Sequence, residues 1–299
     1  MLGGPIQMRL NLGVILLLGL AGPVAAETAD CQVLVETLET FTGLDLSAPP
    51  ADTQDGWCVL DGARLTGEGA PQVSVERLRV AGTVAAEELL SLEIEGTGLR
   101  VRPALNDRDM PGWLRDLLRL QTAEVHLLLR RDEAADRLVL EGGRLELSGG
   151  SALALTGEVA GAHLSAPSML TGRVTALHLE WKNDGRTLRP VMEALGTAVD
   201  PRSTGTQAVL AARGALLGVV DAMPESSLPE ADAEALAAFI AALPQGRGRL
   251  ALDFASEAGI GAAQLGLLAL SDAPAGPEAL TRLLGGARVS AGWAPGILD

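Results

Sequence analysis

Residues 123–164 read AEVHLLLRRDEAADRLVLEGGRLELSGGSALALTGEVAGAHL and carry the clearest alternation of apolar and polar side chains in the chain. Leucine or valine stands at every second position of four short segments, which a charged turn, a Gly-Gly pair and the sequence SGGS separate. A period of two is typical of strands that bury one face and expose the other. With short polar turns between the segments, the stretch predicts an antiparallel meander.

Six leucines occupy the apolar positions of this stretch: Leu138, Leu140, Leu145, Leu147, Leu153 and Leu155. We expect them to continue one apolar face across the Gly-Gly interruption at 142–143. If helices cover that face, the protein is a closed globule with a partner-binding surface. If helices leave a groove, an acyl chain or an apolar peptide lies along these leucines. The sequence leaves both arrangements open.

The same period of two recurs along the chain. It predicts further strands in WCVLDGARL (57–65), QVSVERLRV (72–80), LLSLEIEGTGLRVRP (89–103), GRLALDFAS (248–256) and AAQLGLLAL (262–270). RVTALHLEWKNDGRTL (173–188) predicts a strand pair joined by a turn at Asn183-Asp184-Gly185. The segment SAPPADTQDG (47–56) has the composition of a loop.

Helical spacing of apolar residues appears in four places. A first helix is expected between an N-cap at Asp30 and a stop at Gly43, a short one at 110–121, a helical block at about 188–243, and a last short helix at 276–286. Within the block, Gly214 and Gly218 have the spacing of a close helix contact. Arg213 and Asp221 interrupt the apolar run, which favours ordinary helix packing over membrane insertion.

These elements predict an α+β fold, with curved antiparallel β-meander sheets and helical insertions. We expect residues 1–26 to be a signal peptide, 27–56 an N-terminal helix and loop, and 57–299 a β-rich α+β domain that contains the helical block.

The N-terminus has the layout of a secretory signal. Arg9 precedes an apolar run from Leu10 to Leu20, and Val24 and Ala26 take the small-residue positions of a cleavage site. The run is shorter than the roughly 20 residues of a membrane span. We therefore expect export to the periplasm, cleavage after Ala26 and no stable membrane span afterwards. Met8 is an alternative start, and an uncleaved anchor is the other arrangement.

The two cysteines are interpreted in that compartment. Cys31 and Cys58 are the only pair, and an oxidising environment favours one disulfide over two buried free thiols. A bridge that closes a loop of about 27 residues stabilises a fold by roughly 3–4 kcal/mol in the chain-entropy model.

The charge excludes one class of partner. Removal of residues 1–26 takes away Arg9 and no acid, which changes the net charge from −15 to −16. A chain this acidic repels nucleic acid, so we expect no nucleic-acid partner. The chain contains no tyrosine, which argues against an aromatic platform for sugars.

No catalytic or metal-binding motif stands out. His126, His163 and His178 have no acidic residue at a ligand-like spacing, so we expect isolated histidines in strands or loops. There is no GxSxG motif, and Ser151 lies between two expected strands. Asp132 and Glu133 are expected to be solvated at a hairpin tip. The sequence predicts no cofactor and no enzyme activity.

The segments RLVLEGGRLELSG, LALTGEVAG, LPQGRGRLALDF and ARVSAGWAPG resemble exported alphaproteobacterial proteins of the domain-of-unknown-function type. More distantly, the pattern is similar to AsmA-type envelope proteins. That resemblance implies twisted sheets and phospholipid handling or outer-membrane homeostasis, and it transfers no catalytic residue. We expect a non-enzymatic periplasmic envelope protein whose sheet binds a lipid-like ligand, such as an acyl chain, or an envelope protein. The alternative is a structural or assembly factor that docks protein partners at a sheet edge, and an unrecognised hydrolase comes third.

Overall fold

The computed structural model describes residues 27–48, 52–67, 72–85, 88–102, 121–165, 168, 171–261, 284 and 286–296. The expected signal peptide at 1–26 and the strand at 262–270 lie outside these residues. Nearly all of the expected short helices at 110–121 and 276–286 also lies outside them.

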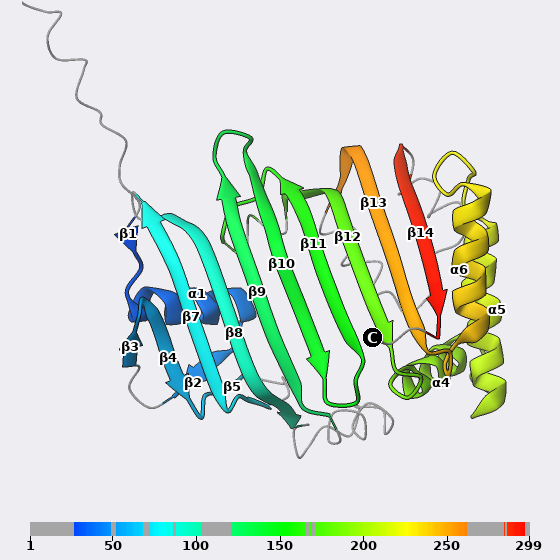
Figure 1. The fold of residues 1–299 in the computed structure, drawn as a ribbon, viewed down its shortest axis with the longest axis horizontal. Coiled ribbons are helices and arrows are strands. Elements are labelled where there is room, and N and C mark those ends of the chain that lie inside the picture. The colour runs from blue at the N-terminus through cyan, green and yellow to red at the C-terminus, as the bar shows by residue number, and fades with distance from the viewer. Residues whose placement is uncertain are drawn as a thin grey trace, which may run out of the picture.

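The described chain is built around one open antiparallel sheet (Figure 1). Seven strands follow one another in the sheet in the order of the sequence, so the expected antiparallel meander is confirmed. They are β8 (Glu88–Arg102), β9 (Ala123–Asp132), β10 (Arg137–Leu147), β11 (Ala152–Ala160), β12 (Arg173–Asn183), β13 (Gly248–Gly261) and β14 (Ala287–Pro295).

Shorter strands complete the N-terminal end of the sheet. Two of them pair with successive parts of β8, namely β7 (Arg77–Ala85) and β6 (Gln72–Ser74). The outer edge of β7 pairs with β4 (Trp57–Asp61) and β1 (Glu27–Thr28), and β6 pairs with β5 (Arg64–Thr66). Outermost are β3 (Asp52–Gln54), paired with β4, and β2 (Asp45–Ser47), paired with β5.

The segment 47–56, expected to be a loop, contains strand β3. Asp52–Gln54 pairs with β4 through a tight hairpin. The hairpin turns at Asp55 and Gly56, which have φ angles of 50° and 81°. Two-residue hairpins favour residues that tolerate positive φ, and Asp-Gly is such a pair. Part of the composition that indicated a loop therefore belongs to the hairpin turn at Asp55 and Gly56.

Helix α1 (Cys31–Thr42) has the ends that the sequence predicts. The Asp30 side chain accepts a hydrogen bond from the Val33 backbone N–H at 2.9 Å, which caps the first turn. Gly43 ends the helix with φ 64° and donates its N–H to the Glu39 carbonyl. Leu34 and Leu38 on one side of α1 are buried against the sheet in the N-terminal core, which includes Cys58, Leu60, Leu78, Val80, Leu92, Leu129 and Leu138.

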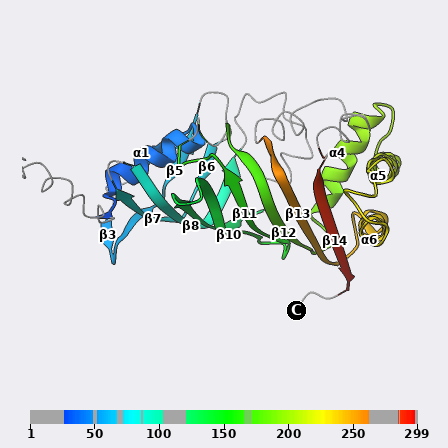
Figure 2. The ribbon, with the colours of Figure 1, turned by 90° about the horizontal axis from the view of Figure 1, so that it is seen from above.

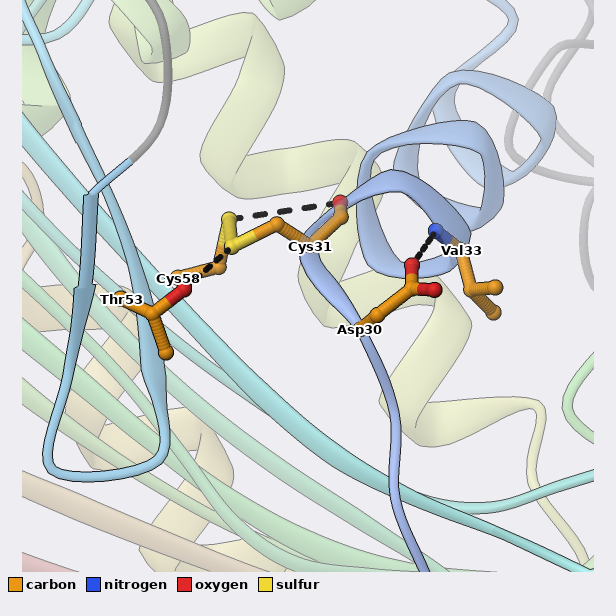
Figure 3. Close-up of a disulfide and its surroundings, with 5 residues drawn as sticks. All are labelled: Asp30, Cys31, Val33, Thr53 and Cys58. Atoms are coloured by element: carbon orange, nitrogen blue, oxygen red, sulfur yellow. Dashed lines mark hydrogen bonds between the residues drawn. A yellow bond between two sulfur atoms is a disulfide. The ribbon is translucent and has the colours of Figure 1, made fainter.

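The expected disulfide between Cys31 and Cys58 is present. It joins the first residue of α1 to β4, with a Cα–Cα distance of 5.2 Å (Figure 3). The bridge fixes the helix over the start of the sheet, where Cys58 is 1% exposed.

Three helices form the insertion between β12 and β13: α4 (Leu188–Val199), α5 (Thr206–Asp221) and α6 (Glu230–Ala242). Two small clusters of buried residues hold them together, one around Met192, Val209 and Leu243 and the other around Val220 and Ile240. In the part of the chain that the structure describes, no helix is long and apolar enough to cross a membrane.

Two local expectations in this region are wrong. The segment after Asn183 leads into α4 instead of turning back as a strand, because Asp184 accepts the backbone N–H groups of Arg186 and Thr187. Gly214 and Gly218 are exposed, and a Cβ at either would meet nothing within 4 Å. The close helix contact lies at Gly196 instead, where a Cβ would fall 1.7 Å from the Ala208 carbonyl oxygen.

Candidate functional site: the apolar face of the sheet

The six leucines of the sequence prediction lie on one face of the sheet. Leu140 pairs with Leu129 of β9, and Leu145 pairs with Val125 of the same regular strand. Residues 125 and 129 are an even number of positions apart, so their partners share a face. Leu153 is paired with Leu145, and Leu155 lies two residues further on the same strand.

A β-bulge makes this arrangement possible. From Leu140 to Gly143, β10 advances three residues, while its partners on β9 and β11 advance two. Without the extra residue, Leu145 and Leu147 would point to the face opposite Leu138 and Leu140. The Gly-Gly pair is therefore the place where the alternation of β10 is reset.

The apolar face continues beyond these leucines. On β12 the paired positions are Leu177, Leu179 and Trp181, and on β13 they are Leu250, Leu252 and Phe254. We call this side of β7–β14 the apolar face and the opposite side the polar face.

Helices contact the apolar face at its two ends. At one end Leu138, 1% exposed, belongs to the N-terminal core under α1. At the other end the ring of Trp293 on β14 meets Phe239 of α6 edge-on, with centroids 5.0 Å apart. Figure 2 shows α1 and α4 on the same side of the sheet, towards its opposite ends.

The leucines between these ends are only half-buried. Leu145, Leu147, Leu153 and Leu155 belong to none of the three clusters of buried residues found in the described ranges. The stretch that the sequence singles out is thus the middle of a long apolar surface whose ends are packed.

The polar face carries charged side chains in cross-strand pairs. Arg79 bonds to Glu95 at 2.5 Å, Arg130 bonds to Glu141, and Arg137 bonds to both Asp132 and Glu158. The bond from Arg137 holds the pKa of Asp132 below its usual range. Asp132, expected to be solvated at the hairpin tip, is therefore paired at the base of the turn.

Two shallow hollows lie on the polar face. One, of about 370 Å³, is lined by His126, Arg144, Glu180 and small residues of β10 and β11. The other, of about 500 Å³, extends toward Asp253 and shares His178 and Thr156 with the first.

The expectation of isolated histidines is wrong for two of the three. His126 Nε2 lies 2.9 Å from Glu93 Oε1, and His178 Nδ1 lies 2.6 Å from Asp253 Oδ1. The hydrogen bond with Asp253 raises the pKa of His178, although desolvation opposes it. The acids come from neighbouring strands 33 and 75 residues away. The spacing of residues along the sequence therefore cannot reveal these pairs. The alternation of side chains along each strand shows only that the histidines and the acids lie on the same face of the sheet.

Ser151 lies in a buried polar network instead of a cleft. Its hydroxyl donates to Asp184 Oδ1 at 2.7 Å and lies 3.0 Å from the Thr187 hydroxyl. Ser151, Asp184 and Thr187 are all buried. These contacts join the turn between β10 and β11 to the start of α4, which gives Ser151 a structural role.

Comparison with known proteins adds no assignment. No family model matches the sequence, and no curated protein matches it at a significance that would indicate common ancestry.

Proposed function

We propose that the protein is a non-enzymatic periplasmic envelope protein that binds a lipid-like ligand, such as an acyl chain, along the apolar face. The observation that carries the proposal is the row of half-buried leucines on β10 and β11, which the register continues onto β12 and β13. An acyl chain needs no hydrogen-bonding partner and gains about 0.8 kcal/mol for each CH₂ group removed from water.

The packed ends of the apolar face support a bounded site. α1 covers one end, and α6 meets the other through Phe239 and Trp293. Curvature of the sheet toward this side, which we expect from the sequence, would deepen the space between them. An apolar surface bounded in this way suits single extended molecules better than the surface of a bilayer.

The charge of the chain supports the same choice. The exported chain would have a net charge of −16, and a strongly acidic protein is repelled by anionic membrane surfaces. We therefore propose binding of individual lipid-like molecules instead of adsorption to a membrane.

Docking at the β14 edge of the sheet, the alternative function, has less support. The helical insertion occupies outward-facing donors of β14: the Val289 N–H donates to the Ser227 carbonyl at 2.7 Å, and the Ala291 N–H to Asp232 Oδ1 at 2.8 Å. An incoming strand needs such donors free. The contacts favour the face over this edge as the binding surface.

The proposed location rests on the N-terminal sequence and the disulfide. The layout of residues 1–26 is that of an export signal, and a disulfide is typical of oxidising compartments. The resemblance to AsmA-type envelope proteins is consistent with the same location and with lipid handling.

The proposal is tested by ligand binding in solution. Native mass spectrometry of the purified protein, with lipid extraction, is expected to show a co-purifying lipid. Titration with a fluorescent fatty acid is expected to give saturable binding. The double variant Leu153→Asn/Leu155→Asn should weaken binding by more than about tenfold, because it places amides on the apolar face.

The matched control is Thr156→Asn, next along β11 but on the polar face, which should bind as the wild type does. Absence of both co-purified lipid and fatty-acid uptake would contradict the proposal. A reproducible protein adduct on the apolar face after crosslinking in cells would instead indicate an envelope partner.

A further inference from the structure

Three potential metal ligands converge on the polar face of β8 and β9. Glu95 is the direct cross-strand partner of His126, and Glu93 lies two residues before Glu95 on the same face of β8. One ligand atom from each of the three residues lies within 4.8 Å of the other two. All three residues are half-buried, and all three stand on paired strands of the sheet.

The geometry suits one small cation. His126 Nε2 and Glu93 Oε1 are 2.9 Å apart. Two ligands of a tetrahedral ion bound at about 2.0–2.2 Å lie roughly 3.3–3.6 Å apart, so this pair has to open by only about 0.5 Å to bind one. Two carboxylates held this close repel each other, and a divalent cation between them would turn that repulsion into attraction.

A neighbouring pair of residues orients one ligand. Arg79 Nη1 bonds to Glu95 Oε2 at 2.5 Å, which leaves Oε1 of the same carboxylate for another partner. The Arg79 guanidinium itself lies over the Trp57 ring, 4.2 Å from its centroid. Outer groups that fix a ligating carboxylate in this way are a regular feature of metal sites.

We propose that Glu93, Glu95 and His126 bind a single divalent transition-metal ion. One imidazole nitrogen and two carboxylate oxygens form a set that suits Zn²⁺. With three protein ligands, a fourth position is left for water. This site is independent of the lipid-binding proposal because it lies on the opposite face of the sheet.

His178 provides an internal contrast. It also has two acidic neighbours, but Asp253 faces its Nδ1 at 2.6 Å while Glu180 faces its Nε2 at 3.7 Å. The two carboxylates therefore lie against different ring nitrogens, and one ion cannot bind both of them together with the imidazole. His178→Gln is the matched control for His126→Gln.

Isothermal titration of the purified protein with Zn²⁺ tests the site. We expect one ion per chain, with affinity lowered by more than about tenfold in Glu93→Gln and in His126→Gln. His178→Gln should bind as the wild type does, and circular dichroism checks that each variant is folded. Absence of Zn²⁺ binding by the wild type would overturn the proposal, as would wild-type affinity in both ligand variants.

A measurement on the wild type covers the case in which a variant does not fold. ¹⁵N NMR of the imidazole rings is expected to show that Zn²⁺ shifts the Nε2 resonance of His126. A shift of His178 or of His163 in its place would overturn the assignment.

Discussion

Asp184 joins three parts of the chain through one carboxylate oxygen. Burial raises the pKa of Asp184, but hydrogen bonds from the Arg186 backbone N–H, from Ser151 and from Thr187 outweigh it and hold the pKa below its usual range. Its other oxygen, Oδ2, is buried and has no hydrogen-bond partner. The charged form is thus stabilised by the folded state through Oδ1.

The effect of Asp184 on stability should depend on pH. Because its pKa is lower in the folded than in the unfolded chain, its contribution is present above about pH 4 and is lost as the pH falls through the folded-state value. We expect Asp184→Asn to lower the free energy of unfolding by about 1–3 kcal/mol at pH 7. Urea denaturation between pH 7 and pH 3 measures this difference, which should shrink at the acid end.

The control for this substitution is Asp221→Asn, which changes an exposed carboxylate at the end of α5. A surface change of this kind is expected to shift stability by less than about 0.5 kcal/mol. Equal losses in the two variants, or a loss in Asp184→Asn that is constant with pH, would contradict the role of the network.

Residue-scale contacts of this type are where sequence reasoning is weakest here. Asn183-Asp184-Gly185 has the composition of a hairpin turn, yet the Asp184 side chain that would favour such a turn accepts the backbone N–H groups just before α4. The pairs of His126 and His178 are formed across strands, so they depend on register and on the long connections between strands. The spacing of residues within one segment specifies neither the register nor the path of these connections.

At the scale of elements, the crossing of α4 and α5 depends on Gly196. A Cβ there would lie 1.7 Å from the Ala208 oxygen, so Gly196→Ala must push the helices apart. We expect a loss of about 1–3 kcal/mol of stability, as in other overpacked sites. Thermal or urea unfolding of the variant measures it.

Gly214→Ala is the matched change on the open side of α5. A Cβ at Gly214 meets nothing within 4 Å, and alanine favours the helix, so this variant should gain about 0.4–1 kcal/mol. Destabilisation by Gly214→Ala together with tolerance of Gly196→Ala would show that the helix contact is misassigned.

The strands themselves are readable from the sequence because alternation is a local property. The segments chosen for their period of two correspond to β4–β13 wherever the structure describes them, except for the second strand expected after Asn183. The caps of α1 are those expected from Asp30 and Gly43. The close helix contact predicted from the spacing of Gly214 and Gly218 is wrong, because small residues permit close packing without requiring it. Which glycine makes the contact depends on the orientation of a neighbouring helix.

At the scale of the whole molecule, the sheet separates two chemistries. From β10 to β13 one face carries leucines and aromatic rings. The opposite face carries ion pairs and two histidines that are hydrogen-bonded to carboxylates. The bulge at Gly142–Gly143 keeps this separation intact across β10. We therefore propose binding of apolar molecules on one side and of a metal ion on the other.

The most direct test of this account is to locate a bound acyl chain on the sheet. A photoactivatable fatty acid is crosslinked to the purified protein, and the modified residues are identified by mass spectrometry. The account predicts adducts on the leucine positions of β10 and β11, such as Leu145, Leu153 and Leu155. Adducts confined to the polar face, for example at Thr156 or Glu158, would contradict it.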